Sequence, residues 1–120
     1  MKRPMPTSEH ERIGLWDVIV VPFPYSDRLA EKRRPALVIS GGSLAAYDLL
    51  WVAMITSADN EPWSCDIPIA DLRRAGLPAQ SVVRPAKIAC IEPARVLRRA
   101  GRLDAKASRA VAEQLRQFLA

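Results

Sequence analysis

The sequence predicts a mainly β protein with minor α content: a small, strongly bent antiparallel barrel with a short internal helix and a C-terminal helix. Three observations predict this fold. Short apolar runs recur along the chain with turn residues between them, which is typical of antiparallel strands. The strand–helix–strand rhythm of a parallel sheet is missing, and a long amphipathic pattern occurs only at the C-terminus. We expect residues 1–12 to form a flexible polar tail and residues 13–120 a single domain.

The first two predicted strands flank a charged loop. The first is expected from about Leu15 to Val21 and ends at a Pro-aromatic-Pro step, because proline cannot donate a ladder hydrogen bond. The second is expected over residues 35–40, and the two form a hairpin. A basic tripeptide, 32–34, lies where the second strand begins. Loops at strand ends are where small domains usually keep their chemistry, so this stretch is the predicted working edge of the protein.

Three further strands are predicted along the chain. Residues 49–55 form a continuous apolar run, typical of a strand buried on both faces. Apolar and polar residues alternate from Trp63 to Ile69, which predicts a fourth strand. Residues 81–91 resume β character, with a bulge or sheet crossing expected at Pro85.

The helices are predicted from their capping residues. Asp71 and Gly76 have the residue types of an N-cap and a C-cap around a short helix. Asp104 has the same N-cap character before an amphipathic helix over residues 105–119. One helical turn is also expected near residues 44–48. We expect the arginine-rich residues 92–102 to form a loop.

The composition favours a polyanionic partner. The net charge is +5, and 18 residues are Lys or Arg. Most of these are arginine, which suits bidentate contact with phosphates. Cys65 and Cys90 show no metal-binding spacing, so we expect buried free thiols rather than a disulfide or a metal site. The absence of a membrane-spanning apolar run and of a signal-peptide core predicts a cytoplasmic protein.

The residue inventory limits the chemistry. His10 is the only histidine and lies in the predicted tail, which argues against serine–histidine, cysteine–histidine and two-histidine ribonuclease mechanisms. The acidic residues are scattered, so metal-assisted hydrolysis lacks a ligand cluster. Arginine, lysine, threonine and serine remain, and these can bind a phosphodiester and stabilise charge that develops on it. RNA brings its own nucleophile, the 2′-hydroxyl, so such a cleft could cleave RNA by positioning alone.

Four motifs carry a resemblance to a known family. The segments VVPFPYSD, KRRPALVIS, VAMITS and SVVRPAKIACIE, in this order and spacing, resemble the MazF/PemK toxins of type II toxin–antitoxin modules. The resemblance runs from about Trp16 to the C-terminus. It implies an SH3-like barrel and a homodimer. It also implies ribosome-independent, sequence-specific cleavage of single-stranded RNA without a metal or cofactor, leaving a 2′,3′-cyclic phosphate. A small antitoxin protein would block the RNA groove, and DNA would be contacted only through that antitoxin.

The resemblance also implies roles for individual residues. By motif, the family's catalytic arginine falls on Arg34 and its active-site threonine on Thr56. Because a guanidinium rarely loses its proton, we expect Arg34 to stabilise the phosphorane rather than act as a base. The group that deprotonates the 2′-hydroxyl stays open. The expected substrate-binding residues are Tyr25, Ser26, Asp27, Arg28, Lys32, Arg33, Ser57, Arg84 and Lys87, with Tyr25 a candidate for stacking on a base.

Two positions depart from the family pattern. Trp16 stands where relatives have a glycine before Asp-Val, so the opening turn cannot use glycine's conformational freedom. Ala86 stands where some relatives have an acidic residue, which removes a candidate acid or base.

Two other classes of function stay open. One is a non-catalytic barrel module that binds nucleic acid or protein. The other is a toxin that poisons a DNA topoisomerase, which would rely on C-terminal protein contacts. A pure binder would need the basic surface but not the Arg34 and Thr56 pair, so the presence of both at strand ends favours the nuclease.

Overall fold

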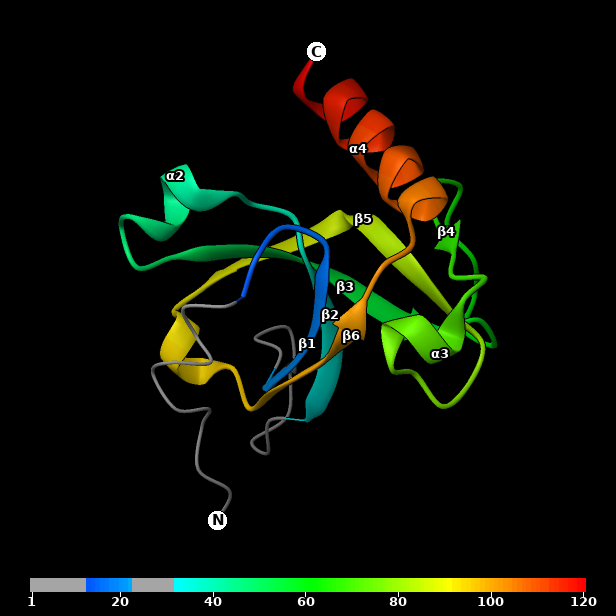
Figure 1. The fold of residues 1–120 in the computed structure, drawn as a ribbon. Coiled ribbons are helices and arrows are strands. Elements are labelled where there is room, and N and C mark those ends of the chain that lie inside the picture. Colours follow the sequence, from blue (N-terminus) through cyan, green and yellow to red (C-terminus); the bar gives the residue numbers. More distant parts are fainter. Residues whose placement is uncertain (1–12, 23–31) are drawn as a thin grey trace.

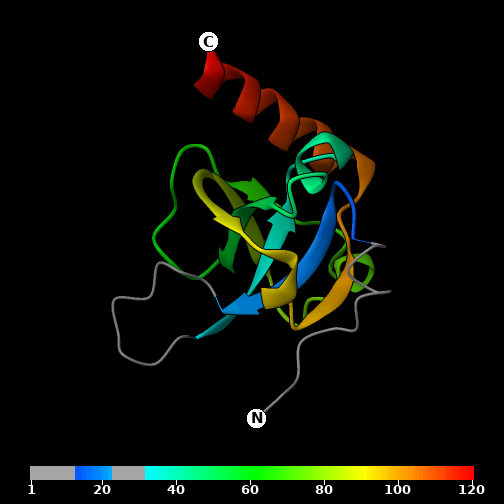
Figure 2. The same cartoon turned by 90° about the vertical axis from the view of Figure 1, so that its left-hand side faces the viewer.

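The computed structural model describes residues 13–22 and 32–120, and their strands form one sheet in the order β4-β5-β3-β2-β1-β6. Every pair of neighbouring strands is antiparallel. The sheet curls into a half-barrel, as the two views in Figures 1 and 2 show. The strands are β1 (Asp17–Pro22), β2 (Arg33–Val38), β3 (Leu50–Ser57), β4 (Ile67–Pro68), β5 (Ser81–Ile91) and β6 (Arg98–Arg102). The mainly β, antiparallel fold predicted from the sequence is confirmed.

The helices are short except for the last. They are α2 (Gly42–Ala45), α3 (Leu72–Ala75) and α4 (Ala105–Leu119), with a 3-10 turn at Pro93–Arg95. The predicted caps are confirmed. The Asp71 carboxylate accepts the Arg74 N–H at 3.0 Å, and the Asp104 carboxylate accepts the Ala107 N–H at 2.9 Å. Each cap satisfies a backbone donor that the first helical turn leaves without a partner.

Alternate residues of the strands build two apolar layers, one on each face of the sheet. The first layer includes Ile19, Val21, Ala36, Val38, Val52 and Ile91. The second includes Val18, Leu37, Ala53, Ile55, Val83 and, from α4, Ala107 and Val111. Helix α4 therefore packs on part of the second face: it begins beside β4 and β5 and then extends away from the sheet in Figure 1. None of the helices in the described part of the chain has the length and apolarity needed to cross a membrane.

The bulge predicted at Pro85 is present in β5. Ala53 pairs with Ile88 while its neighbour Met54 pairs with Arg84, so three residues of β5 have no counterpart on β3. Proline lacks the N–H that the ladder would use, so the strand tolerates an interruption there. Such a bulge increases local bending and helps the sheet to curl.

The strand predicted from Trp63 to Ile69 is wrong for most of its length, since β4 contains only Ile67 and Pro68. The Asp66 carboxylate accepts the Trp63 N–H at 2.9 Å, and the Trp63 carbonyl accepts the Asp66 N–H at 3.0 Å. These two hydrogen bonds close a turn where the alternating pattern suggested extended backbone.

The loop predicted over residues 92–102 is also partly wrong, because residues 98–102 form β6 against β1. The Asp17 carboxylate is buried in β1, with only 1% of its side chain exposed. It lies 3.2 Å from both Arg99 and Arg102. A buried carboxylate needs such partners, so part of the arginine-rich tract has a structural role.

The two cysteines differ in burial. Both are free thiols, as predicted, but Cys65 is buried whereas Cys90 is exposed. The prediction of a buried thiol at Cys90 is therefore wrong. Its strand β5 has buried neighbours at Ala89 and Ile91, so alternation turns Cys90 to the solvent.

Trp16 adopts the backbone conformation that glycine would favour, with φ at +74°. A side chain in this region costs on the order of 1 kcal/mol. The surrounding structure holds it there. The Trp16 N–H donates to the Val38 carbonyl at 2.9 Å, the Trp16 carbonyl accepts from Leu103 at 2.9 Å, and the ring packs on the second apolar layer. Packing and hydrogen bonds thus replace glycine's freedom at this turn.

An added methyl group at Gly76 would clash with the backbone of β6. Its φ is +74°, and a Cβ atom there would lie 2.0 Å from the Ala100 carbonyl oxygen of β6. We expect Gly76→Ala to lower the free energy of unfolding by at least about 2 kcal/mol, from the left-handed conformation plus the backbone clash. Urea denaturation would measure this. Gly42→Ala is the matched control, because nothing lies within 4 Å of its Cβ position. Equal stability of the two variants would contradict the prediction.

Candidate functional site

Arg34 and Thr56 share one face of the sheet, at one end of the first apolar layer. Ala36 of β2 lies opposite Met54 of β3, and Arg34 and Thr56 each lie two residues from this pair. Residues two apart on a strand point to the same side. Arg34 also pairs with Val21 across β1 and is half-buried. Both predicted catalytic side chains therefore point to the same side of the sheet, from neighbouring strands.

The Thr56 hydroxyl is buried and has a defined partner. Only 5% of Thr56 is exposed, and its Oγ1 accepts a hydrogen bond from Asn60 Nδ2 at 2.6 Å. Asn60 is held in turn by its own N–H, which donates to the Ser57 carbonyl at 3.1 Å. A hydroxyl carries one donor and two acceptor positions. Because Asn60 uses an acceptor position, the Thr56 O–H can donate to an oxygen brought to the site.

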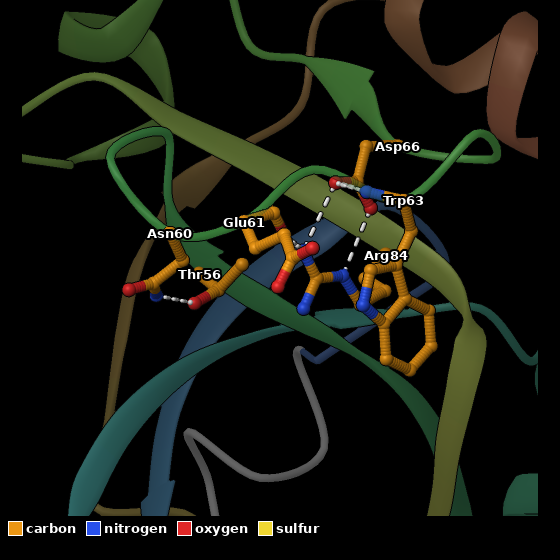
Figure 3. Close-up of polar contacts among 6 residues, drawn as sticks. All are labelled: Thr56, Asn60, Glu61, Trp63, Asp66 and Arg84. Carbon is orange, nitrogen blue, oxygen red and sulfur yellow. Dashed lines mark hydrogen bonds and ion pairs between the residues drawn. The ribbon is translucent and has the colours of Figure 1, made fainter.

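Arg84 lies on the same face of the sheet, opposite Met54, and forms a bidentate ion pair (Figure 3). Its Nε donates to Asp66 Oδ1 at 2.9 Å and its Nη2 to Asp66 Oδ2 at 3.0 Å. Nη2 also donates to the Glu61 carbonyl at 3.0 Å. Both charged side chains are less than one-tenth exposed. The structure therefore places Arg84 in a buried pair that ties down the loop between β3 and β4.

The same ion pair positions Trp63. The Arg84 guanidinium carbon lies 4.3 Å from the centre of the Trp63 ring, a cation–π contact. Asp66 holds the Trp63 backbone as well, through the N–H described above. The hydrogen bond from Arg84 lowers the pKa of Asp66 below its ordinary value of 3.8. The carboxylate therefore stays ionised at neutral pH, and the pair persists.

The remaining predicted binding residues surround this face to different degrees. Lys32 and Arg33 are exposed at the start of β2. Ser57 is exposed, and its hydroxyl accepts the Asp59 N–H at 3.1 Å. Lys87 is half-buried in the β5 bulge. Four residues of the predicted substrate-binding loop lie outside the described residues: Tyr25, Ser26, Asp27 and Arg28. His10 lies outside them as well.

Asn60, Trp63 and Asp66 were not predicted as site residues. All three come from the loop between β3 and β4, and they contact Thr56 or Arg84. Asn60 belongs to an Ala-Asp-Asn-Glu-Pro segment that follows a buried strand. In the sequence, the only feature that pointed to this loop was its run of polar turn residues directly after a buried strand.

No three histidine, cysteine, aspartate or glutamate side chains gather as a potential metal site within residues 13–22 and 32–120. The site as described is instead built from guanidinium, hydroxyl, amide and indole groups. Together these can bind an anion, donate hydrogen bonds to it and support a flat aromatic ligand.

Comparisons with solved structures show that this half-barrel shares its fold with several proteins. A Mycobacterium tuberculosis toxin, MazF-mt6, has a TM-score of 0.67 at 21% identity, over 86% of this chain and 95% of that one. MazF from Deinococcus radiodurans has a TM-score of 0.70 at 19% identity, over 89% and 96%. An endoribonuclease from a mycobacterial species, solved with its cognate antitoxin, has a TM-score of 0.68 at 10% identity, over 89% and 92%. These likenesses define the class of fold.

The family model for the PemK-like, MazF-like toxin of type II toxin–antitoxin systems matches residues 15–119. The chain therefore belongs to this toxin family, as its motifs predicted. A search of curated protein sequences gave no match.

Proposed function

We propose that this protein is the toxin of a type II toxin–antitoxin module and a cytoplasmic endoribonuclease that cleaves single-stranded RNA at a short sequence without a metal or a ribosome. The placement of Arg34 and Thr56 on one face of neighbouring strands carries this proposal. The family and the endoribonuclease among the structural neighbours support it.

In the proposed reaction the 2′-hydroxyl oxygen attacks the adjacent phosphorus. The bond from phosphorus to the 5′-oxygen breaks, which leaves a 2′,3′-cyclic phosphate and a free 5′-hydroxyl. The proton lost by the 2′-hydroxyl goes to a base that the described residues do not define, and the departing 5′-oxygen gains a proton.

Arg34 and Thr56 would stabilise the charge that develops at phosphorus. A guanidinium keeps its proton at any relevant pH, so Arg34 donates hydrogen bonds to the phosphorane and to the departing oxygen. Thr56 is oriented by Asn60, and its O–H is available to a non-bridging phosphate oxygen or a ribose hydroxyl. Groups fixed before the substrate arrives stabilise the transition state most effectively.

The other polar residues would bind the RNA strand. We assign Lys32, Arg33, Ser57 and Lys87 to this role, together with the loop residues predicted from the sequence. For Arg84 we infer an indirect role, because its guanidinium is engaged by Asp66 and Glu61. It would hold the loop that carries Asn60 and Trp63.

The proposed partners are a cognate antitoxin and a second copy of this chain. The antitoxin follows from the family, and structural neighbours include MazE–MazF complexes. An antitoxin that covers the face carrying Arg34 and Thr56 would inhibit cleavage by excluding RNA. Light scattering of the purified protein would give the oligomeric state.

A cleavage assay in EDTA tests the proposed activity. Folded protein is incubated with several long single-stranded RNAs, without antitoxin, and the fragment ends are identified. We expect discrete fragments with 2′,3′-cyclic phosphate ends. A folded protein that cuts none of the RNAs would instead favour the non-catalytic binding module.

Loss of the Thr56 hydroxyl tests its assigned role. We expect Thr56→Val to lower kcat by roughly 10- to 100-fold, the effect of one hydrogen bond to a charged group. Thr56→Ser keeps the hydroxyl and should retain most of the activity. Cleavage kinetics of both variants, with thermal unfolding as the check on folding, would measure this. Equal kcat for Thr56→Val and the wild type would remove Thr56 from the mechanism.

A further inference from the structure

Trp63 has an unusual setting for a surface tryptophan. The residue is 44% exposed, yet its backbone and one ring face are fixed by the buried Arg84–Asp66 pair. An exposed aromatic ring that is held rigidly loses little conformational entropy when a ligand stacks on it. Such rings are the stacking platforms of proteins that bind single-stranded nucleic acids.

The loop that carries Trp63 is anchored at two points of the candidate site. Near its start, Asn60 donates to the Thr56 hydroxyl at 2.6 Å. Near its end, Asp66 holds Arg84, which lies opposite Met54, two residues along β3 from Thr56. Figure 3 shows these residues gathered along one side of the sheet, with the indole lying over the Arg84 guanidinium. Trp63 therefore lies on the Arg84 side of the candidate site, in the same loop as the Asn60 that holds the Thr56 hydroxyl.

We propose that Trp63 is a stacking platform for one unpaired RNA base that flanks the scissile phosphate. This rests on the proposed endoribonuclease function and names a subsite for its substrate. The Arg84 guanidinium, held by Asp66, supports the indole from one side and leaves the ring in place for a ligand. A base stacked here would fix the position of the adjoining phosphate relative to Thr56.

A role as a mere cover for the ion pair makes a different prediction. A leucine at position 63 would still shield Arg84 and Asp66 from water, but it offers no flat ring. Trp63→Leu therefore separates stacking from shielding. Trp51 is the matched control, because it is 48% exposed, lies near the other end of β3 and is outside the candidate site.

The experiment starts from the site at which the wild type cuts RNA. A short labelled RNA spanning that site, with a single 2′-deoxy nucleotide at the cleaved position, lacks the nucleophile and stays intact. Its affinity is measured by fluorescence anisotropy for the wild type, Trp63→Leu and Trp51→Leu. A matching series of RNAs carries one abasic nucleotide at each flanking position.

We expect Trp63→Leu to weaken binding by roughly 5- to 150-fold, the range for one stacked base, and Trp51→Leu to leave it unchanged. One abasic position should weaken the wild type by a similar factor and cause no further loss in Trp63→Leu. The platform would be overturned if folded Trp63→Leu bound RNA as tightly as the wild type. It would also be overturned if, at every abasic position, the affinity lost through the missing base simply added to the affinity lost through Trp63→Leu. If the wild type cuts RNA, those results reject the platform alone. If it neither cuts nor binds RNA, the proposed function fails as well.

Discussion

Arg34→Ala is expected to lower kcat for RNA cleavage by about 10²- to 10³-fold, the loss seen when one fixed donor is removed from a developing negative charge. Arg34 is a half-buried residue on the face that also carries Thr56, so alanine leaves the phosphorane without its nearest assigned cation. The affinity for intact RNA should fall much less. Single-turnover cleavage in EDTA, with rate and affinity determined separately, would measure both effects.

Arg34→Lys and Arg33→Ala are informative controls for this prediction. Lysine keeps the charge but lacks the planar fork of donors, so it should restore only part of the rate. Arg33 is the exposed neighbour on β2, and its removal should weaken binding and lower the salt dependence rather than kcat. If Arg34→Ala cleaved as fast as the wild type while folded, the family assignment would stand and the catalytic site would lie elsewhere.

Local patterns in the sequence predicted where Arg34 and Thr56 lie, because Arg34 precedes one apolar run and Thr56 follows another. Their assignment to the candidate site came from the family resemblance. The bulge at Pro85 is likewise local, because it follows from the missing N–H of proline. These features need no knowledge of distant partners.

The parts that the sequence did not predict depend on contacts between distant segments. Arg84 and Asp66 are 18 residues apart, and nothing in the spacing pairs them. The alternation from Trp63 to Ile69 fits a strand equally well, but the Trp63 N–H donates to the Asp66 carboxylate and closes a turn instead. The strand β6 was missed for a similar reason. Its arginine-rich sequence shows no alternation of apolar and polar residues. The partner of these arginines, the buried Asp17, lies in the first strand, 85 residues from Arg102 along the chain.

The Asp66–Arg84 pair provides the largest expected effect on stability. Asp66→Ala would leave the Arg84 guanidinium, 8% exposed, without its counter-charge. We expect the free energy of unfolding to fall by on the order of 3 kcal/mol, as for other broken buried pairs. Urea denaturation at neutral pH would measure this. The double variant Asp66→Ala with Arg84→Met removes both charges and should recover part of the loss, because an apolar replacement leaves no unpaired ion. A double variant no more stable than Asp66→Ala would show that the ion pair is not the cause.

The contribution of this pair should also depend on pH in a defined direction. Since the hydrogen bond from Arg84 lowers the pKa of folded Asp66 below 3.8, protons bind more readily to the unfolded chain. The stabilisation is therefore complete above that value and is lost as the pH falls through the lower, folded-state pKa. The stability difference between the wild type and Asp66→Ala should stay constant from neutral pH down to about pH 5 and shrink below about pH 4. The same pair holds Trp63 and the loop that bears Asn60, so acid that protonates Asp66 should also release the Trp63 platform. If the stability difference between the wild type and Asp66→Ala did not change in acid, the stabilisation would come from packing and not from the ion pair.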